Sequence, residues 1–120
     1  MTAPVTELVA PKANVVLVEG DILCVTRKIM ELTQSFKLEC KKVGILATDE
    51  TVQFYPDGIV KCLGSRLNLA GIAQNLFRLL RELDPESVDV IIAESVPSEG
   101  LGLAVMNRLR KASGYNIIKV

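Results

Sequence analysis

Residues 98–118 read SEGLGLAVMNRLRKASGYNII and combine a glycine turn, the start of a helix and a closing strand in one unit. Gly100 and Gly102 allow a tight turn that leaves backbone amides uncovered. A helix that begins near Gly102 directs its positive dipole end at whatever lies before the turn. One interpretation is therefore an anion site at the turn. The other is close packing between a strand and a helix, because a lone GxG is a weak signal.

Four short apolar runs precede this unit. Bounded by turn residues, they are typical of buried strands at residues 14–19, 43–47, 59–63 and 88–93. Residues 115–120 predict a fifth strand that closes the sheet. The turn residues PDG set off the 59–63 strand, and we expect that strand at an edge of the sheet.

Apolar residues at helical spacing predict two helices between these strands. The first spans residues 22–36 with Asp21 as its N-cap, and the second spans residues 69–83 with Asn68 as a cap and Asp84-Pro85 as its stop. In the last two helices, the apolar positions expected to face the core are Leu76, Phe77, Leu80, Leu103, Met106 and Leu109.

Strands that alternate with amphipathic helices predict right-handed βαβ crossovers. The expected fold class is α/β, a small Rossmann-like three-layer domain with a mostly parallel sheet of about five strands and helices on both faces. In such sheets the ligand crevice lies beyond the carboxyl ends of the strands, where the strand order reverses. We therefore expect residues 19–21 to lie opposite residues 93–95 and the 100–102 turn.

Length and composition indicate one domain. The chain has 120 residues and is 49% hydrophobic, which suffices for one core. Residues 1–13 carry two prolines and are expected to form an extended arm or linker remnant, with the domain at residues 14–120. No apolar run approaches the about 20 residues that span a bilayer, and no signal segment is present, so a cytoplasmic location is expected.

Charge and cysteine usage exclude several classes of partner. Lysine plus arginine equals aspartate plus glutamate at 14 each, so no basic field is available to hold a nucleic acid directly. Cys24, Cys40 and Cys62 are far apart in the sequence and form no CxxC motif. Neither a disulfide framework nor a zinc site is indicated, and we expect reduced, packed thiols.

Cofactor and catalytic motifs are also lacking. The first strand is followed by EGDILC instead of GxGxxG, and no GxxxxGK[ST] occurs, so neither a dinucleotide nor a Walker-type ATP site is predicted. The sequence has no histidine, which excludes Ser-His and Cys-His nucleophiles; a general base would have to be a carboxylate, lysine or tyrosine. We therefore predict no catalytic residue, no metal and no cofactor.

Polar residues near the strand ends and on the last helix allow two readings. Asp49 and Glu50 form either a functional carboxylate pair or solvated turn residues. Asn107 and Arg108 lie where a guanidinium can fork onto a phosphate or carboxylate. Their structural alternative is to cap a neighbouring loop or to pair with Glu94 or Glu99. The candidate ligand-binding residues are Gly20, Asp21, Gly100, Leu101, Gly102, Asn107 and Arg108.

Several segments together suggest a family. EGLGLAVMNRLRKASGYNII, with VGILATDET, VKCLGS, NLAGIAQNLFRLLRELD and VDVIIAE, resembles the C-terminal, Sua-type domain of the threonylcarbamoyl-AMP synthase family over about residues 10–118. In that family a larger N-terminal catalytic domain of the YrdC type makes threonylcarbamoyl-adenylate from threonine, bicarbonate and ATP, for threonylcarbamoyladenosine in tRNA. The motifs of that catalytic domain have no counterpart here, so the resemblance implies a domain without synthase activity.

Two functions follow as hypotheses. One is a non-catalytic accessory or regulatory domain that docks on a YrdC-type catalytic domain in cis or in trans. The alternative is a stand-alone small-molecule protein that binds a nucleotide or another anion at residues 100–108. A structural, dimer-forming domain is a third and weaker hypothesis. Whether the chain is a fragment or a complete gene product is left open.

Overall fold

The computed structural model describes residues 14–83 and 88–120. The predicted arm at residues 1–13 and the Asp84-Pro85 stop lie outside the described residues. In chain order the elements are β1 (Asn14–Glu19), α1 (Ile22–Leu38), β2 (Val43–Ala47), the 3-10 helix η2 (Val52–Phe54), β3 (Ile59–Cys62), α2 (Leu69–Leu83), β4 (Val90–Glu94), α3 (Leu101–Ala112) and β5 (Ile117–Lys119).

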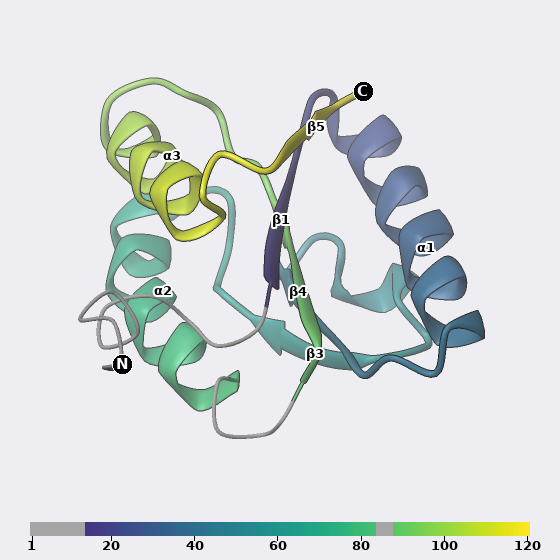
Figure 1. Ribbon diagram of the computed structural model, residues 1–120. Helices are drawn as coiled ribbons and strands as arrows, with labels where there is room; N and C mark the ends of the chain where they lie inside the picture. The colour runs from purple at the N-terminus through teal and green to yellow at the C-terminus, as the bar shows by residue number, and fades with distance from the viewer. Residues whose placement is uncertain (1–13, 84–87) are drawn as a thin grey trace, which may run out of the picture.

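The strands of the described residues form one five-stranded sheet. Its order is β3-β2-β4-β1-β5, and every neighbouring pair is parallel. The connection from β1 to β2 runs toward the β3 edge, whereas those from β3 to β4 and from β4 to β5 run the other way. Right-handed crossovers then place α1 on one face and α2 and α3 on the other, as Figure 1 shows. The predicted α/β fold class and the edge position of β3 are confirmed.

The strand order reverses between β2 and β4. These two strands are neighbours, and the chain continues from β2 toward the β3 edge but from β4 toward the β5 edge, which makes this the topological switch point at which doubly wound sheets form a crevice. On its other side β4 pairs with β1, with Val18 opposite Glu94. The predicted proximity of residues 19–21 and 93–95 is confirmed.

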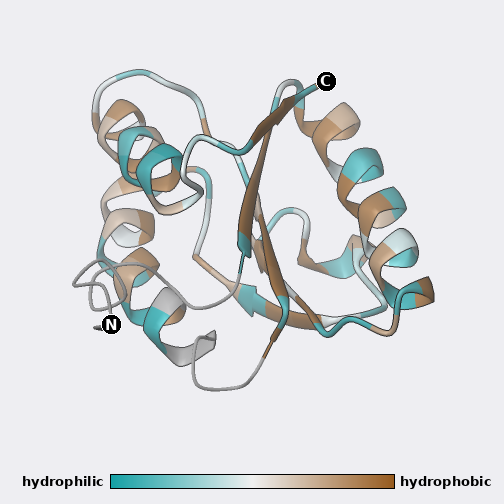
Figure 2. Cartoon of the chain, viewed as in Figure 1, coloured by the Kyte–Doolittle hydropathy of each residue, from teal (hydrophilic) through white to brown (hydrophobic). Residues whose placement is uncertain are grey.

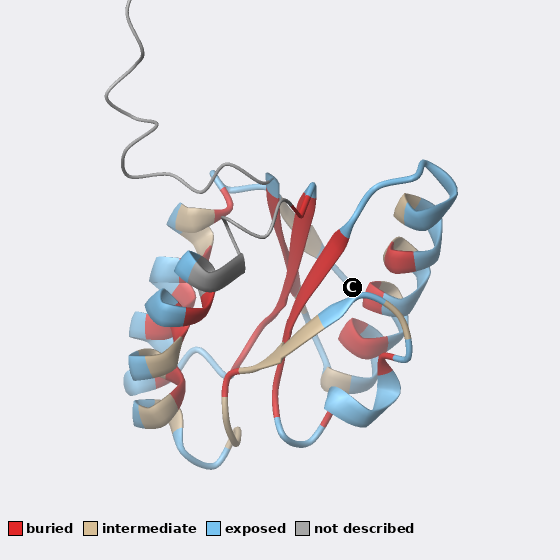
Figure 3. Ribbon diagram, turned by 90° about the horizontal axis from the view of Figure 1, so that it is seen from below, coloured by how far each residue is buried: buried red, intermediate tan, exposed pale blue. Residues whose placement is uncertain are grey.

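The core consists of two apolar layers, one on each face of the sheet. Because side chains alternate along a strand, Val16 and Val18 of β1 pack under α1, whereas Val15 and Leu17 pack under α2 and α3. Figure 2 shows the central strands largely in the hydrophobic colour. Figure 3 shows these strands buried between the two helical layers. Burial on both faces explains why the strands read as continuous apolar runs.

The predicted core positions of the last two helices are partly correct. Leu76, Met106 and Leu109 are buried, as expected, whereas Phe77 is 44% exposed and Leu103 is 45% exposed. The buried face of α3 follows residues 102, 105, 106 and 109, and Leu103 falls outside that stripe. Phe77 lies at the edge of the buried stripe of α2, where α2 meets α3. The side chain of Leu80 lies outside the description.

The cysteines are free thiols, but the expectation that they are packed is wrong for two of them. Cys24 and Cys40 are exposed, and Cys62 is partly buried. The Cys62 thiol donates a hydrogen bond to Asp49 Oδ1 at 2.7 Å. Burial, together with this carboxylate, raises the pKa of the Cys62 thiol. The Cys62 side chain is therefore held as a thiol, not a reactive thiolate.

Candidate functional site

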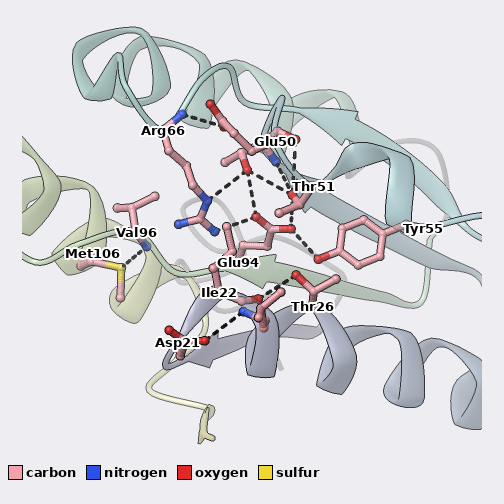
Figure 4. Close-up of polar contacts among 12 residues, drawn as sticks. Asp21, Ile22, Thr26, Glu50, Thr51, Tyr55, Arg66, Glu94, Val96 and Met106 are labelled. Carbon is pink, nitrogen blue, oxygen red and sulfur yellow. Dashed lines mark hydrogen bonds and ion pairs between the residues drawn. The ribbon is translucent and has the colours of Figure 1, made fainter.

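A buried carboxylate marks the carboxyl edge of the sheet. Glu94 ends β4 and is 0% exposed. Its Oε1 accepts hydrogen bonds from Arg66 Nη2 at 2.9 Å and from Thr48 Oγ1 at 3.2 Å. Its Oε2 accepts from the hydroxyls of Thr51 and Tyr55 (Figure 4). We call these five residues the Glu94 network. A charge buried here requires such partners, since desolvation of an unpaired carboxylate is costly.

The sheet order explains how distant segments supply this network. Thr48 and Thr51 follow β2, the neighbour of β4, and Tyr55 follows η2. Arg66 lies in the loop after β3, on the far side of β2. The backbone N–H of Thr48 donates to Thr51 Oγ1 at 3.2 Å, which closes the turn after β2. Arg66 Nε donates to Thr48 Oγ1 at 3.2 Å, so one guanidinium joins the turn and the buried carboxylate.

The exposed neighbour Glu50 fixes the loop that carries Arg66. Its carboxylate accepts from the backbone N–H of Arg66 at 2.9 Å and from Ser65 Oγ at 2.7 Å. These hydrogen bonds hold the pKa of Glu50 below its usual value. Asp49 instead contacts Cys62, so Asp49 and Glu50 bind different partners. Both serve the loops around them and do not act as a carboxylate pair.

The Tyr55 hydroxyl is a hydrogen-bond donor and is not suited to act as a general base. Burial is the main cause that raises the pKa of the Tyr55 phenol. The hydrogen bond to Glu94 and the negative charge of that carboxylate raise this pKa further. A raised pKa keeps the proton on the hydroxyl at neutral pH. Among the bases that the sequence left open, this tyrosine is therefore unsuitable for abstracting a proton.

A second ion pair closes the edge beside β1. Arg110, in the last turn of α3, donates from Nε to Glu19 Oε2 at 2.9 Å and from Nη2 to Glu19 Oε1 at 3.3 Å. This bidentate contact joins α3 to the end of β1. It raises the pKa of the Arg110 guanidinium further above its ordinary value.

Gly20 and Asp21, two of the predicted ligand residues, have structural roles at the end of β1. Gly20 has φ +149°, and a Cβ there would lie 2.5 Å from the carbonyl oxygen of Val120. The Val120 N–H donates to Glu19 O at 2.8 Å, so the C-terminal residue lies directly against this turn. Asp21 accepts from the N–H of Leu23 at 3.2 Å, which confirms it as the N-cap of α1.

The 100–102 turn also has a packing explanation. A Cβ on Gly102 would lie 1.8 Å from the carbonyl oxygen of Pro97, so only glycine allows this close approach. Gly100 is the N-cap of α3 with φ +57°, a conformation that favours glycine, and Leu101 is exposed. This geometry supports the strand–helix packing interpretation for Gly102. Anion binding at the turn stays a prediction.

Asn107 and Arg108 lie on the exposed side of α3. The Arg108 guanidinium lies over the Phe77 ring, 4.5 Å from its centroid, in a cation–π contact between α3 and α2. The predicted alternative of an Arg108–Glu94 pair is wrong, because Arg66 is the partner of Glu94. Phe77 is thus stacked under a guanidinium at the helix interface and not enclosed in the core.

Four members of the Glu94 network, Thr48, Thr51, Tyr55 and Arg66, were not predicted as site residues. A usable signal was the glutamate that ends the apolar run VIIAE, because a carboxylate in a strand buried on both faces must have partners. The polar TDET that follows another apolar run was a second signal. No signal in the sequence indicated Arg66, because its pairing with Glu94 depends on β2 and β4 being neighbours in the sheet.

Two further observations concern the described residues alone. In these ranges, no group of three or more histidine, cysteine, aspartate or glutamate side chains is placed to hold a metal ion. Residues 14–83 and 88–120 also contain no helix that is both long and apolar enough to cross a membrane.

Comparison with known proteins identifies the family. Residues 10–114 match the family described as "Threonylcarbamoyl-AMP synthase, C-terminal domain". The chain is 53% identical to the threonylcarbamoyl-AMP synthase of Pyrococcus abyssi and 40% identical to that of Bacillus subtilis. In both comparisons 92% of this chain is covered, and it spans 31% of the relative's length.

Solved structures agree with these matches. The crystal structure of P. abyssi Sua5 complexed with L-threonine has a TM-score of 0.81 at 52% identity, over 92% of this chain and 31% of that one. The C-terminal Sua5 domain from Pyrococcus horikoshii has a TM-score of 0.74 at 44% identity, over 92% of this chain and 100% of that chain. This chain belongs to the family of threonylcarbamoyl-AMP synthase C-terminal domains.

Proposed function

We propose that this chain is a non-catalytic accessory domain that acts with a YrdC-type catalytic domain, in cis or in trans, in the threonylcarbamoyladenosine modification of tRNA. The observation that carries the proposal is the extent of the match. The chain covers 31% of proteins named threonylcarbamoyl-AMP synthase, and the matching family is their C-terminal domain. The remaining two thirds of those relatives have no counterpart in this sequence.

The chemistry of the carboxyl edge supports a non-catalytic role. The Glu94 carboxylate is buried and surrounded by its own donors, and Tyr55 keeps its proton. The Cys62 thiol is held protonated beside Asp49. A catalytic group must face a substrate and be in a reactive protonation state. These residues meet neither condition, and their contacts instead hold the carboxyl edge together.

The threonine site of the family is proposed to lie outside this domain. The P. abyssi protein was crystallised with L-threonine, and this chain matches 31% of it. We expect the isolated chain not to bind L-threonine. Isothermal titration calorimetry with L-threonine, run beside the full P. abyssi protein as positive control, tests this. Saturable heat from the isolated chain would place a threonine site in the domain and contradict the proposal.

Anion binding at the 100–102 turn is the alternative, and one observation favours it. Gly100 has no side chain to cap α3, so the first amides of the helix have no side-chain acceptor there, although those of Gly102 and Leu103 already donate to the carbonyls of Glu99 and Gly100 at 2.9 and 3.1 Å. The acidic Glu99, the residue before Gly100, opposes it. The test is an NMR titration with phosphate, AMP and ATP. Saturable amide shifts confined to residues 20–21 and 100–104 would support the site, and their absence at millimolar ligand would exclude it.

A further inference from the structure

The turn between η2 and β3 contains the one Asp-Gly pair of the sequence, Asp57-Gly58, and the sequence has no Asn-Gly pair. An aspartate is most open to attack by the next backbone nitrogen when that nitrogen belongs to glycine, because glycine has no side chain to shield it or to restrict the backbone. The other aspartates precede glutamate, proline or a β-branched residue. Asp57 is therefore the position at which the sequence favours rearrangement of the backbone.

This rearrangement has two steps, and water is its sole co-reactant. In the first step the Gly58 nitrogen attacks Cγ of Asp57. A C–N bond forms, and the carboxyl hydroxyl leaves as water together with the amide proton, which gives a cyclic succinimide. Water then adds to the ring. Cleavage at the main-chain carbonyl carbon of Asp57 gives isoaspartate, in which the chain continues through Cβ and Cγ, whereas cleavage at Cγ restores aspartate. The first step requires the protonated carboxyl group, because a carboxylate resists nucleophilic attack.

Two side chains of α1 hold the Asp57 carboxylate. Gln34 Nε2 donates to Oδ2 at 2.8 Å, and Lys37 Nζ pairs with Oδ1 at 2.9 Å, so both oxygens have a partner. The hydrogen bonds from Lys37 and Gln34, and the charge of Lys37, hold the pKa of the Asp57 carboxyl below its ordinary value. At neutral pH the group is kept ionised and tethered to α1, and both effects oppose attack at Cγ.

Gly58 is confined on the other side of the turn. It has φ +91°, a conformation that favours glycine, and a Cβ there would lie 3.2 Å from the carbonyl oxygen of Val43 and 3.4 Å from Ile45 Cδ1. The next residue, Ile59, is already paired with Gly44 in the sheet. Ring closure requires rotation of the backbone at this turn, and these contacts oppose the rotation. The turn must therefore open locally before the reaction proceeds.

We propose that Asp57 is the residue at which this chain forms isoaspartate, and that its contacts with Gln34 and Lys37 slow the conversion in the folded protein. Isoaspartate adds one methylene to the main chain directly before Gly58 and moves the carboxylate away from Lys37. Because Gly58 has little space against β2, the modification should loosen the start of β3. The inference concerns chemical modification of the chain and does not depend on the proposed accessory role.

The test compares rates of isoaspartate formation at neutral pH and body temperature. The samples are the whole chain and a synthetic peptide of residues 53–61, which lacks α1. Protein L-isoaspartyl methyltransferase with labelled S-adenosylmethionine measures the product, and mass spectrometry of tryptic peptides with electron-transfer fragmentation locates it. We expect the product of the whole chain at residue 57, formed several-fold more slowly than in the peptide. Equal rates in the chain and the peptide, or isoaspartate that forms first at another residue, would overturn the proposal.

Variants of α1 test the two contacts. Gln34 and Lys37 are exposed, so the double variant Lys37→Met with Gln34→Leu should keep the fold and speed the conversion several-fold. Lys28→Met removes an ion pair elsewhere on the same helix and should leave the rate unchanged. Asp57→Glu should abolish the product, because the longer side chain disfavours a five-membered ring. A double variant as slow as the unaltered chain would contradict the protective role of the contacts.

Leu76→Ala distinguishes local opening of the turn from global unfolding. Leu76 belongs to the core layer under α2 and α3, whereas Val43 and Ile45 belong to the layer under α1. The variant lowers global stability without altering the turn, so we expect it to leave the rate of conversion unchanged. If Leu76→Ala sped the conversion as much as the double variant does, the two contacts would act through global stability alone, which would overturn the proposed local protection.

Discussion

Arg66 Nη2 lies 2.9 Å from Glu94 Oε1, and this ion pair joins the loop after β3 to the buried end of β4. The Glu94 side chain is completely buried, whereas 16% of the Arg66 side chain is exposed. The pair therefore spans from the core to the surface at the carboxyl edge. Breaking it from the surface side would leave a negative charge inside the protein.

Arg66→Met should destabilise the fold for this reason. Loss of one partner from a buried ion pair costs about 3 to 5 kcal/mol, and solvent access at Arg66 reduces the expected loss to about 2 to 4 kcal/mol. Urea denaturation measures it. Lys28→Met, at the exposed Lys28–Glu31 pair of 2.9 Å, is the matched control and should cost less than about 1 kcal/mol.

The double variant Arg66→Met with Glu94→Gln tests whether the loss comes from the stranded charge. Neutralising Glu94 removes the unpaired carboxylate, so the double variant should be more stable than the sum of the two single losses implies. Strictly additive losses would mean that Arg66 and Glu94 contribute independently.

The raised pKa of Tyr55 predicts that the folded protein loses stability at alkaline pH. The pKa of its phenol is raised in the folded protein, so above an ordinary tyrosine pKa of about 10 the unfolded chain loses this proton first. The contribution of Tyr55 is complete below that pH and is lost as the pH rises toward the folded value. Tyr55→Phe should flatten this decline, measured by urea denaturation between neutral and alkaline pH. Tyr115→Phe, at an exposed tyrosine, should preserve it.

Alanine substitutions at Gly102 and Gly100 distinguish two reasons for a glycine. One is close contact with another backbone atom, and the other is a positive φ. Gly102→Ala places a methyl group onto the Pro97 carbonyl and should cost about 1 to 3 kcal/mol or more. Gly100→Ala meets no atom within 4 Å, so only its φ of +57° is unfavourable, at about 1 to 2 kcal/mol. Thermal and urea denaturation of both variants measure the difference. If Gly102→Ala were as stable as the unaltered chain, the packing explanation of this turn would fail.

Phe77 and Leu76 are adjacent on α2 but differ in burial. Leu76→Ala should cost about 2 to 5 kcal/mol, because Leu76 is completely enclosed. Phe77→Ala should fall below the about 3 to 5 kcal/mol of a core phenylalanine, because its ring is 44% exposed under Arg108. The same denaturation experiments rank the two. A larger loss for Phe77→Ala would contradict the arrangement of α2 and α3.

The alternation of strands and helices could be predicted from sequence because the apolar runs of the three central strands, β1, β2 and β4, are buried on both faces. Residues 14–19 and 43–47 match β1 and β2 to the residue. Helical periodicity wrongly predicted that Phe77 and Leu103 are buried. The periodicity marks the apolar face of a helix, but it does not show how much of that face the neighbouring elements cover. The Glu94 network joins segments up to 46 residues apart, so it required the strand order, which the sequence did not supply.

The most direct test of the proposed function is threonine-dependent release of pyrophosphate from ATP in the presence of bicarbonate. The samples are this chain, the part of the B. subtilis relative that this chain does not match, which we propose holds the catalytic domain, and an equimolar mixture. The proposal predicts no release above the blank by the chain alone, and a rate for the mixture that differs from that of the catalytic domain. Release by the chain alone that scales with its concentration and persists through independent purifications would contradict the non-catalytic role. A mixture identical to the catalytic domain at every ratio would contradict docking in trans.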